Sequence, residues 1–327
     1  MKKKLLITGG TGFVAYHLIE EAIRQNFEVY VSIRSSSSTA HLKAFDVQFI
    51  HLNFTDENAI VTELEKGQYQ YIIHTAGTTK AANDNQYNLV NASYTQALAL
   101  AAVKAKIPLE KFVFVSSLAA VGPSGENGTI KNDIKPAPVT AYGRSKLLAE
   151  KLLKEITQLP LITIRPTAVY GPREKDIFIV FKTFKKGLEP YIGGGAQTLS
   201  FVYVKDLARL VINMLNSDIE GKAYNVCDGK SYSRYALADF AKQALGKRTF
   251  KIVLPIPLVK LIASGLELTG RIAGKSPALN KDKIKELTAS WNCNIDELKK
   301  DFQFEPAYDL ERGIKETIAW YQTNNWL

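Results

Sequence analysis

Near the start of the chain runs Thr8-Gly9-Gly10-Thr11-Gly12-Phe13-Val14-Ala15, a glycine-rich turn between a short apolar run and a segment of helical length. A strand, turn and helix in this order can hold a pyrophosphate, because glycine lets the anion approach the backbone and the helix N-terminus supplies amide donors and a favourable dipole. Gly9 permits the tight turn, Gly12 the close approach, and Phe13 and Val14 open the helix. We therefore predict that these four residues bind a dinucleotide.

Apolar runs and segments of helical spacing alternate through the first half of the chain. The expected strands are residues 4–8, 28–33, 47–52, 69–74, 111–116 and 161–165. The expected helices between them are residues 13–25, 56–66, 87–106 and 141–157. Such alternation predicts an α/β fold with a doubly wound parallel sheet, whose ligand crevice lies at the carboxyl ends of the strands.

After Pro166 this alternation loosens and the chain reads as mainly helical from Lys230 onward. We expect a dinucleotide-binding domain over residues 1–165, to which residues 199–226 return. Residues 166–198 and 227–327 are expected to form a smaller, discontinuous, mainly helical substrate-binding lobe.

Composition narrows the class of protein. The chain has 327 residues, of which 46% are hydrophobic and 23% charged, and this is typical of a folded globular protein rather than a disordered or fibrous one. Cys227 and Cys293 are too few for a disulfide framework and lack metal-binding spacing, so a reduced cytoplasmic setting and no metal are expected.

The chain carries a net charge of +10 and no uninterrupted apolar run of membrane-spanning length. The charge predicts a solvated basic surface or an anionic partner. No segment resembles a nucleic-acid-binding module. Residues 252–268 are apolar but interrupted by prolines and charges, so this segment is expected to pack in the core, cover a substrate or rest on a membrane.

The end of the second strand bears on the choice of cofactor. It reads Val31-Ser32-Ile33-Arg34-Ser35 and lacks the carboxylate that often binds the ribose 2′-hydroxyl of NAD. A guanidinium can pair with a 2′-phosphate instead. Arg34 therefore favours NADP(H), with NAD(H) as the alternative, and Lys43 is a second candidate phosphate contact.

Tyr142 and Lys146 lie four residues apart, which places a phenol and an ammonium on one face of the helix expected at 141–157. A nearby positive charge favours the phenolate and lowers the pKa of the tyrosine. Tyr142 could then donate a proton to a carbonyl, or accept one from an alcohol, during hydride transfer. Ser117 follows the strand at 111–116 and is expected to hydrogen-bond the same substrate oxygen.

In these features the chain resembles an extended short-chain dehydrogenase/reductase, the family of NAD(P)-dependent epimerases and dehydratases with a Rossmann-type fold. The resemblance covers nearly the whole chain. It is carried, in order, by residues 8–13, His74-Thr75-Ala76-Gly77, Ser116-Ser117, Tyr142 with Lys146, residues 165–172, Phe201-Val202-Tyr203-Val204-Lys205-Asp206 and Tyr224-Asn225-Val226.

The resemblance implies roles for individual residues. Ser117, Tyr142 and Lys146 would form the catalytic triad, and Lys146 would also hold the nicotinamide ribose. The other residues implied to contact the cofactor are Asn53 and Phe54 beside the adenine, Ala76, Gly77 and Thr78 after the fourth strand, and Pro166 and Val169 near the nicotinamide. Asn91 would either brace the site by bonding buried backbone or contact the cofactor.

Departures from the family pattern bear on the substrate. Sugar-nucleotide dehydratases resemble one another in having Asp-Glu where this chain has Ser116-Ser117. The epimerases usually have asparagine at the position of Ala168 and tend to have a phosphate-binding arginine at that of Leu199. The remaining branch resembles dihydroflavonol reductases and 3β-hydroxysteroid dehydrogenases, to which residues 29–34 and 255–262 are similar.

We predict an NAD(P)-dependent oxidoreductase that interconverts a ketone and a secondary alcohol on a fairly apolar substrate, such as a lipid, steroid-like or long-chain compound. The alternative enzyme is a nucleotide-sugar epimerase with tightly held NAD. A non-catalytic NADPH sensor is disfavoured by the intact Tyr142 and Lys146. The expected partners are a small-molecule substrate and, through helices 87–106 and 141–157, a second copy of the chain. A cytoplasmic location, with or without peripheral contact at the inner face of a membrane, is expected.

Overall fold

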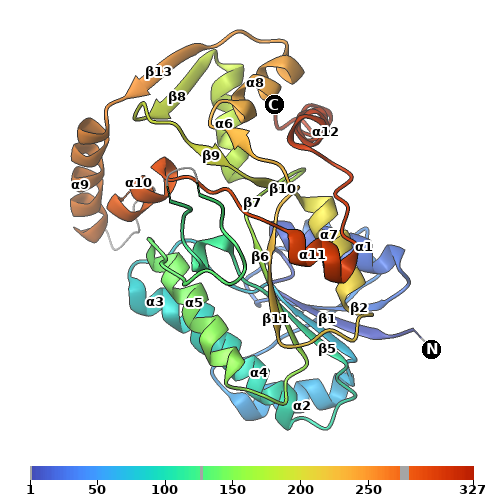
Figure 1. Cartoon of the computed structure of the whole chain (residues 1–327). Coiled ribbons are helices and arrows are strands. Elements are labelled where there is room, and N and C mark those ends of the chain that lie inside the picture. The colour runs from blue at the N-terminus through green and yellow to red at the C-terminus, as the bar shows by residue number, and fades with distance from the viewer. Residues whose placement is uncertain (1, 126–127, 273–279) are drawn as a thin grey trace. The chain divides into compact units, whose positions relative to one another are not determined.

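A seven-stranded sheet is formed mainly by strands from the first half of the chain (Figure 1). The structure is a computed structural model that describes residues 2–125, 128–272 and 280–327. The strands, in spatial order, are β3 (Gln48–Ile50), β2 (Glu28–Ser32), β1 (Lys4–Thr8), β4 (Tyr71–His74), β5 (Lys111–Val115), β6 (Leu161–Pro166) and β11 (Lys222–Val226). Every pairing from β3 to β6 is parallel. This order confirms the predicted doubly wound, Rossmann-type sheet.

Helices cover both faces of this sheet, which explains why the central strands are continuous apolar runs rather than alternating ones. On one face lie α2 (Glu57–Gly67), α4 (Tyr94–Lys104) and α5 (Ala141–Lys154) (Figure 1). On the other lie α1 (Phe13–Arg24) and α7 (Val204–Met214), joined by a hydrogen bond from Gln25 to Asn213. The strand order reverses between β1 and β4, so the loops after these two strands diverge and leave room for a ligand.

One helix differs from its predicted form. The sequence predicts a single helix over 87–106, whereas the structure has α3 (Asp84–Asn88), a π turn (Leu89–Ser93) and then α4. In this wide turn the N–H of Tyr94 donates to the carbonyl of Leu89, five residues earlier. The hydroxyl of Thr95 donates to the carbonyl of Asn91 at 2.8 Å. A π turn of this kind is rare and is often found at functional sites.

The chain divides into two compact units. The first consists of Met1–Ala120, Tyr142–Arg165 and Leu207–Tyr224, and the second of Val121–Ala141, Pro166–Asp206 and Asn225–Leu327. Residues 121–141, 199–206 and 225–226 thus belong to the second unit, although the sequence groups them with the first. The assignment of one unit to the dinucleotide and the other to the substrate stays a prediction.

The second unit combines small sheets with helices around an aromatic core. Its strand pairs are β7 (Ala168–Tyr170) with β10 (Phe201–Tyr203), β9 (Thr198–Leu199) with β12 (Tyr232–Ser233), and β8 (Leu188–Ile192) with β13 (Phe250–Leu254). Its helices are α6 (Asp176–Lys185), α8 (Ala236–Leu245), α9 (Ile256–Ile272), α10 (Lys281–Thr288), α11 (Asp296–Phe302) and α12 (Leu310–Thr323). Buried aromatic residues such as Tyr170, Phe181 and Tyr321 fill the space between α6, α8 and α12.

Two segments of this unit are divided between elements. Ser200 separates β9 from β10, and its hydroxyl donates to the carbonyl of Lys230. The apolar segment 252–268 is not one element either. It begins within β13, breaks at Pro255 and continues as α9, and the side chains of residues 266–268 lie outside the described part.

Candidate active site

The turn between β1 and α1 has the geometry of a phosphate cradle. Gly9 has φ of +70°, and a methyl group there would lie 2.7 Å from the backbone nitrogen of Ala76. The N–H of Gly12 donates to the carbonyl of Gly9 at 2.9 Å. Gly12 is the N-cap of α1 and has no side chain to cap it, and the first turn of α1 contains no acidic residue. The first amides of this helix, including those of Phe13 and Val14, therefore suit an anion such as a pyrophosphate.

The end of β2 leads to Arg34, the residue expected to pair with the 2′-phosphate of NADP(H). Backbone hydrogen bonds fix it: Gly10 N–H donates to Ser32, and Ile33 N–H donates to Ile50. Arg34 follows with an exposed side chain, and Lys43 is exposed as well. No carboxylate lies within residues 29–45. An exposed guanidinium at this strand end is compatible with a 2′-phosphate.

A buried histidine joins the glycine-rich turn to the helix after β4. His74 Nε2 lies 2.9 Å from the hydroxyl of Thr95, which itself donates to the carbonyl of Asn91. That hydroxyl must accept from Nε2, so Nδ1 is unprotonated and accepts from the hydroxyl of Thr8 at 2.7 Å. Burial, and then the charge of Lys146, lower the pKa of His74 to about 3.

This neutral histidine should make the protein sensitive to acid. Between the ordinary histidine pKa and pH about 3, His74 is protonated in the unfolded chain but neutral in the folded one. The free energy of unfolding therefore falls as the pH falls through this range. We expect His74 to account for a loss of about 1 kcal/mol in the free energy of unfolding between pH ~7 and pH ~5.5. Urea unfolding of the parent and of His74→Asn at the two pH values measures it. The same pH dependence in both proteins would refute this attribution.

Asn91 uses its amide to connect two parts of the site. Its Oδ1 accepts from the N–H of Thr78 at 2.7 Å, and its Nδ2 donates to the carbonyl of Thr78 and to the hydroxyl of Ser145, both at 2.9 Å. The hydroxyl of Ser145 in turn donates to the carbonyl of Tyr142 at 2.7 Å. Asn91 thus ties the loop after β4 to the first turn of α5. A direct contact with the cofactor stays a prediction.

Lys146 is buried beside the end of β5 and the loop after β4. Its ammonium donates to the carbonyl of Val115 at 2.9 Å and lies 4.8 Å from the centre of the Phe114 ring. A methyl group on Gly77 would be 3.5 Å from this ammonium, so the two groups are close neighbours. Burial lowers the pKa of Lys146 to about 8, and the charge of Glu150 opposes part of that shift. Lys146 is therefore mostly cationic at neutral pH.

Ser117 and Tyr142 both precede this lysine in the chain, one just after β5 and the other in α5. Ser117 follows β5 two residues after Val115, and its Oγ accepts from the N–H of Ala119 at 3.2 Å, which leaves its own hydrogen for another acceptor. Tyr142 occupies the first turn of α5, one turn before Lys146, and is partly exposed. The fold thus brings the ends of β4 and β5 and the start of α5 together, as expected for the carboxyl edge of the sheet.

Sequence reasoning missed one buried ionic network behind these residues. Arg165, at the end of β6, donates from Nε to both carboxylate oxygens of Glu150 at 3.1 Å and from Nη2 at 2.7 Å. The two side chains are only 11% and 9% exposed. Ser116, the neighbour of Ser117, donates its hydroxyl to the same carboxylate. Glu150 lies four residues after Lys146 on α5, a helical spacing that could have pointed to it.

The other residues predicted to contact the cofactor are spread over several elements. The Oδ1 of Asn53 accepts from the N–H and hydroxyl of Thr55, so it forms a local turn after β3. Phe54 stacks on Tyr94 with ring centres 5.8 Å apart. Pro166 and Val169 belong to the second unit, where Val169 pairs with Val202. Their roles toward a cofactor stay predictions.

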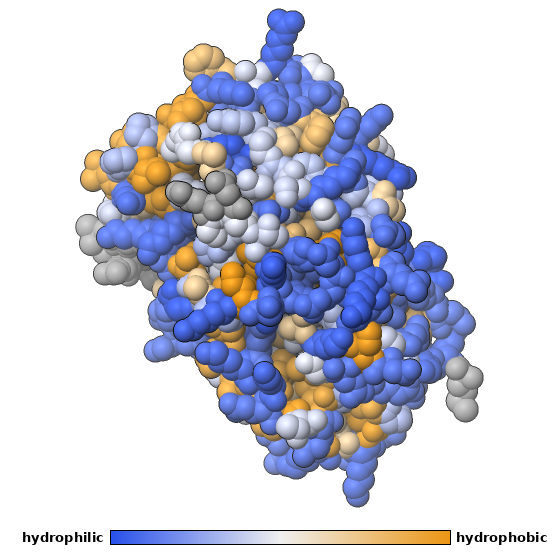
Figure 2. Space-filling model, in the orientation of Figure 1, coloured by the Kyte–Doolittle hydropathy of each residue, from blue (hydrophilic) through white to orange (hydrophobic). Residues whose placement is uncertain are grey.

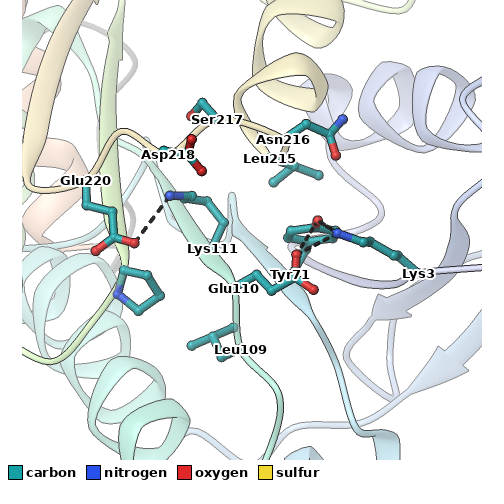
Figure 3. A pocket seen from close by; sticks show the side chains of 11 residues that line it. Lys3, Tyr71, Leu109, Glu110, Lys111, Leu215, Asn216, Ser217, Asp218 and Glu220 are labelled. Atoms are coloured by element: carbon teal, nitrogen blue, oxygen red, sulfur yellow. Dashed lines mark hydrogen bonds and ion pairs between the residues drawn. The ribbon is translucent and has the colours of Figure 1, made fainter.

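A cavity of about 520 Å³ lies at the opposite edge of the sheet, where β4 and β5 begin (Figure 3). It is lined by Lys3, Tyr71, Leu109, Glu110, Lys111, Pro160, Leu215, Asn216, Ser217, Asp218 and Glu220. Lys3, Tyr71 and Glu110 bond one another, and Lys111 donates to the carbonyl of Ile219. Because ligands of such sheets bind at the carboxyl ends of the strands, we do not assign the active site here.

The comparisons with known proteins agree with this geometry. The model of the NAD dependent epimerase/dehydratase family matches residues 5–227. The chain is 28% identical to a UDP-glucose 4-epimerase of Vibrio cholerae, over 99% of this chain and 98% of the relative. It is 23% identical to a decarboxylating sterol-4-alpha-carboxylate 3-dehydrogenase of Candida albicans, over 97% of each. The structure of UDP-glucuronic acid 4-epimerase from Bacillus cereus in complex with NAD has a TM-score of 0.77 at 21% identity, covering 98% of this chain and 96% of that one.

Fold and site together define an enzyme of the extended short-chain dehydrogenase/reductase type, as the sequence predicted. The chain belongs to the NAD dependent epimerase/dehydratase family. Its relatives include both nucleotide-sugar epimerases and sterol dehydrogenases, so the family alone leaves the substrate open. No helix in the described part of the chain is long and apolar enough to cross a membrane.

Proposed function

We propose that this enzyme interconverts a ketone and a secondary alcohol on a fairly apolar substrate, with NADP(H) as the favoured cofactor. The observation that carries the chemistry is the buried Lys146, fixed by Val115 one turn after Tyr142. Gly9, Gly12 and the first turn of α1 would hold one end of the cofactor, and the loop 76–78 with Lys146 the other. When bound, it would supply or accept the hydride.

In this proposal the chain's own residues handle the proton and the substrate oxygen. Tyr142 gives its phenolic proton to the carbonyl oxygen during reduction and takes it back during oxidation. The hydroxyl of Ser117, which accepts from the N–H of Ala119, donates its hydrogen to the same substrate oxygen. The cation of Lys146 stabilises the phenolate that is left on Tyr142. Asn91 and Ser145 hold the first turn of α5, and with it the tyrosine backbone, against the loop after β4.

The apolar substrate is supported by residues in the second unit. Leu199 stands where the sugar-nucleotide epimerases tend to have an arginine for the nucleotide phosphates. Leu199 pairs with Tyr232 across β9 and β12 and forms a bridge with Trp291, so its surroundings are largely apolar. A cation for a diphosphate is thus absent from this position, while an apolar molecule would lose little by binding near it.

The second candidate is a nucleotide-sugar epimerase, which the 28% identity to the UDP-glucose 4-epimerase of Vibrio cholerae favours. It would use the same tyrosine and lysine, but its cofactor would be regenerated in each turnover and would not need to leave. The cytoplasmic location and the homodimer predicted from the sequence also stay proposals.

Mass spectrometry of the molecules released by denaturing freshly purified protein separates the two candidates. The reductase should release NADP, or nothing in stoichiometric amount, because its cofactor exchanges at each turnover. Stoichiometric NAD together with a uridine nucleotide would overturn the reductase in favour of the epimerase.

The preference for NADP(H) rests on Arg34 and can be tested by Arg34→Ala. A charge-assisted hydrogen bond to the 2′-phosphate is worth about 1.5–3 kcal/mol, so the Kd for NADPH should rise by roughly ten- to a hundredfold. The Kd for NADH, which lacks that phosphate, should not change. Quenching of intrinsic fluorescence on cofactor addition measures both values. Lys43→Ala, at the second candidate contact, should have a smaller effect, and Lys2→Ala, at an exposed lysine with no proposed role, is the control. Equal losses for NADPH and NADH would contradict the proposed role.

A further inference from the structure

Helix α9 presents an apolar stripe outward as well as inward. Val259 is only 2% exposed and packs with Ala263 against Ile284 of α10. On the other side Leu258, Leu261 and Ile262 stand three and four residues apart, and Leu261 is 71% exposed. A surface helix normally has one apolar stripe, directed at the core. The second stripe on α9 is therefore available for another surface.

The β8–β13 pair, which precedes α9 in the chain, also exposes apolar side chains. Phe250 and Leu188 are direct cross-strand partners, and the phenylalanine is 72% exposed. Val253 is exposed further along β13. We call Leu188, Phe250, Val253, Leu258, Leu261 and Ile262 the apolar edge. In Figure 2, orange atoms gather at the upper left, over the region where Figure 1 shows β13, β8 and α9.

Cations surround the apolar edge, and acids are missing from its segments. Residues 177–188 and 240–265 contain no Asp or Glu, but they contain Lys182, Lys185, Lys186, Lys242, Lys247, Arg248, Lys251 and Lys260. All of these except Lys242 are exposed. Of the acids that border these segments, Glu189 is buried and bonded by Lys242 and Tyr191, and Asp239 pairs with Lys242. Lys251 lies 3.9 Å from Glu189. The edge thus combines protruding apolar groups with an excess of exposed positive charge from the other six cations.

We propose that the apolar edge docks on the surface of an anionic lipid bilayer. Apolar side chains that enter the headgroup region, together with lysines and arginines that pair with anionic lipid, are the recognised combination for such binding. A second copy of this chain fits less well, because a symmetric contact would place the two sets of cations against each other. Binding of this kind is peripheral, in keeping with the absence of a spanning helix from the described part of the chain.

Sedimentation of the full chain with vesicles tests the proposal without substrate or cofactor. The protein should bind phosphatidylcholine vesicles that contain phosphatidylglycerol more tightly than phosphatidylcholine alone, and high salt should weaken this binding. The single variant Phe250→Ser and the double variant Leu261→Ser with Ile262→Ser should each weaken vesicle binding by on the order of tenfold. Each variant removes apolar area that the bilayer would otherwise bury. Lys185→Gln with Lys186→Gln should have an effect of similar size.

Matched controls come from exposed residues elsewhere. Phe49→Ser removes another exposed phenylalanine, and Lys299→Gln with Lys300→Gln removes another adjacent pair of exposed lysines. Both should bind vesicles like the parent. The proposal is overturned if the parent fails to bind anionic vesicles at low salt, or if the controls lose as much binding as the edge variants. It is also overturned if Phe250→Ser instead abolishes self-association in sedimentation velocity, which would make the edge an interface between copies.

Discussion

Tyr142→Phe is expected to lower kcat by about a thousandfold while cofactor affinity stays at the parent's value. The substitution removes only the hydroxyl that gives or takes the proton, and general acid–base catalysis by one side chain contributes roughly a hundred- to ten-thousandfold. Lys146 keeps its bond to Val115, and the glycine-rich turn is untouched, so the dinucleotide should bind as before. Turnover is measured with apolar ketones and NADPH, and affinity by fluorescence titration.

Tyr30→Phe is the matched control for this prediction. Its hydroxyl donates to Glu28 on β2 and has no place in the proposed chemistry, so turnover should persist. Near-normal turnover in Tyr142→Phe would remove the tyrosine from the mechanism. A loss of cofactor binding along with turnover would instead mean that the phenol holds the dinucleotide. The prediction applies equally to an epimerase, because both candidate functions use the same proton transfer.

Arg165→Met is expected to lower the free energy of unfolding by about 3–5 kcal/mol, the typical cost of removing one partner from a buried ion pair. Glu150 would be left as a nearly buried carboxylate that keeps the hydrogen bond from Ser116, the residue after β5. Because Glu150 follows Lys146 by one helical turn and Ser116 precedes Ser117, turnover should fall as well. Urea unfolding measures the first effect and steady-state kinetics the second.

The double variant Glu150→Met with Arg165→Met is the informative companion. Replacing both members of a buried pair by apolar residues of similar volume is often neutral or stabilising. Most of the lost stability should therefore return in the double variant. A loss below about 1 kcal/mol in Arg165→Met would place the pair among weak surface ion pairs, contrary to its burial.

The sequence predicted those elements that are specified by residues close together in the chain. The glycine-rich turn, the apolar runs of β1, β4 and β5, and the helical spacing of Tyr142 and Lys146 each lie within a few residues of one another. Their order in space follows from the rules for parallel sheets, which bring the ends of neighbouring strands to one edge. The family resemblance read from these motifs is confirmed by the match over residues 5–227.

Features that depend on distant partners could not be predicted in the same way. The sequence did not predict β13, which lies in a stretch expected to be mainly helical. This strand forms by pairing with β8, about sixty residues earlier in the chain, and no local pattern indicates that pairing. The pair of Glu150 and Arg165 joins a helix to a strand that follows it, and no local pattern specifies that contact. The π turn at Leu89–Ser93 adds a residue to one turn, a change too small to alter the apolar periodicity of the helix.

That wide turn sets stability against function in a single stretch of backbone. Without the extra residue the segment would close into an ordinary helix, and the wide turn that joins the N–H of Tyr94 to the carbonyl of Leu89 would be lost. The helix before the turn would also rotate relative to α4, and Asn91 would no longer face both Thr78 and Ser145. A variant selected only for thermal stability would thus be expected to delete one residue from this turn. The same deletion would break the hydrogen bonds by which Asn91 joins Thr78 to Ser145.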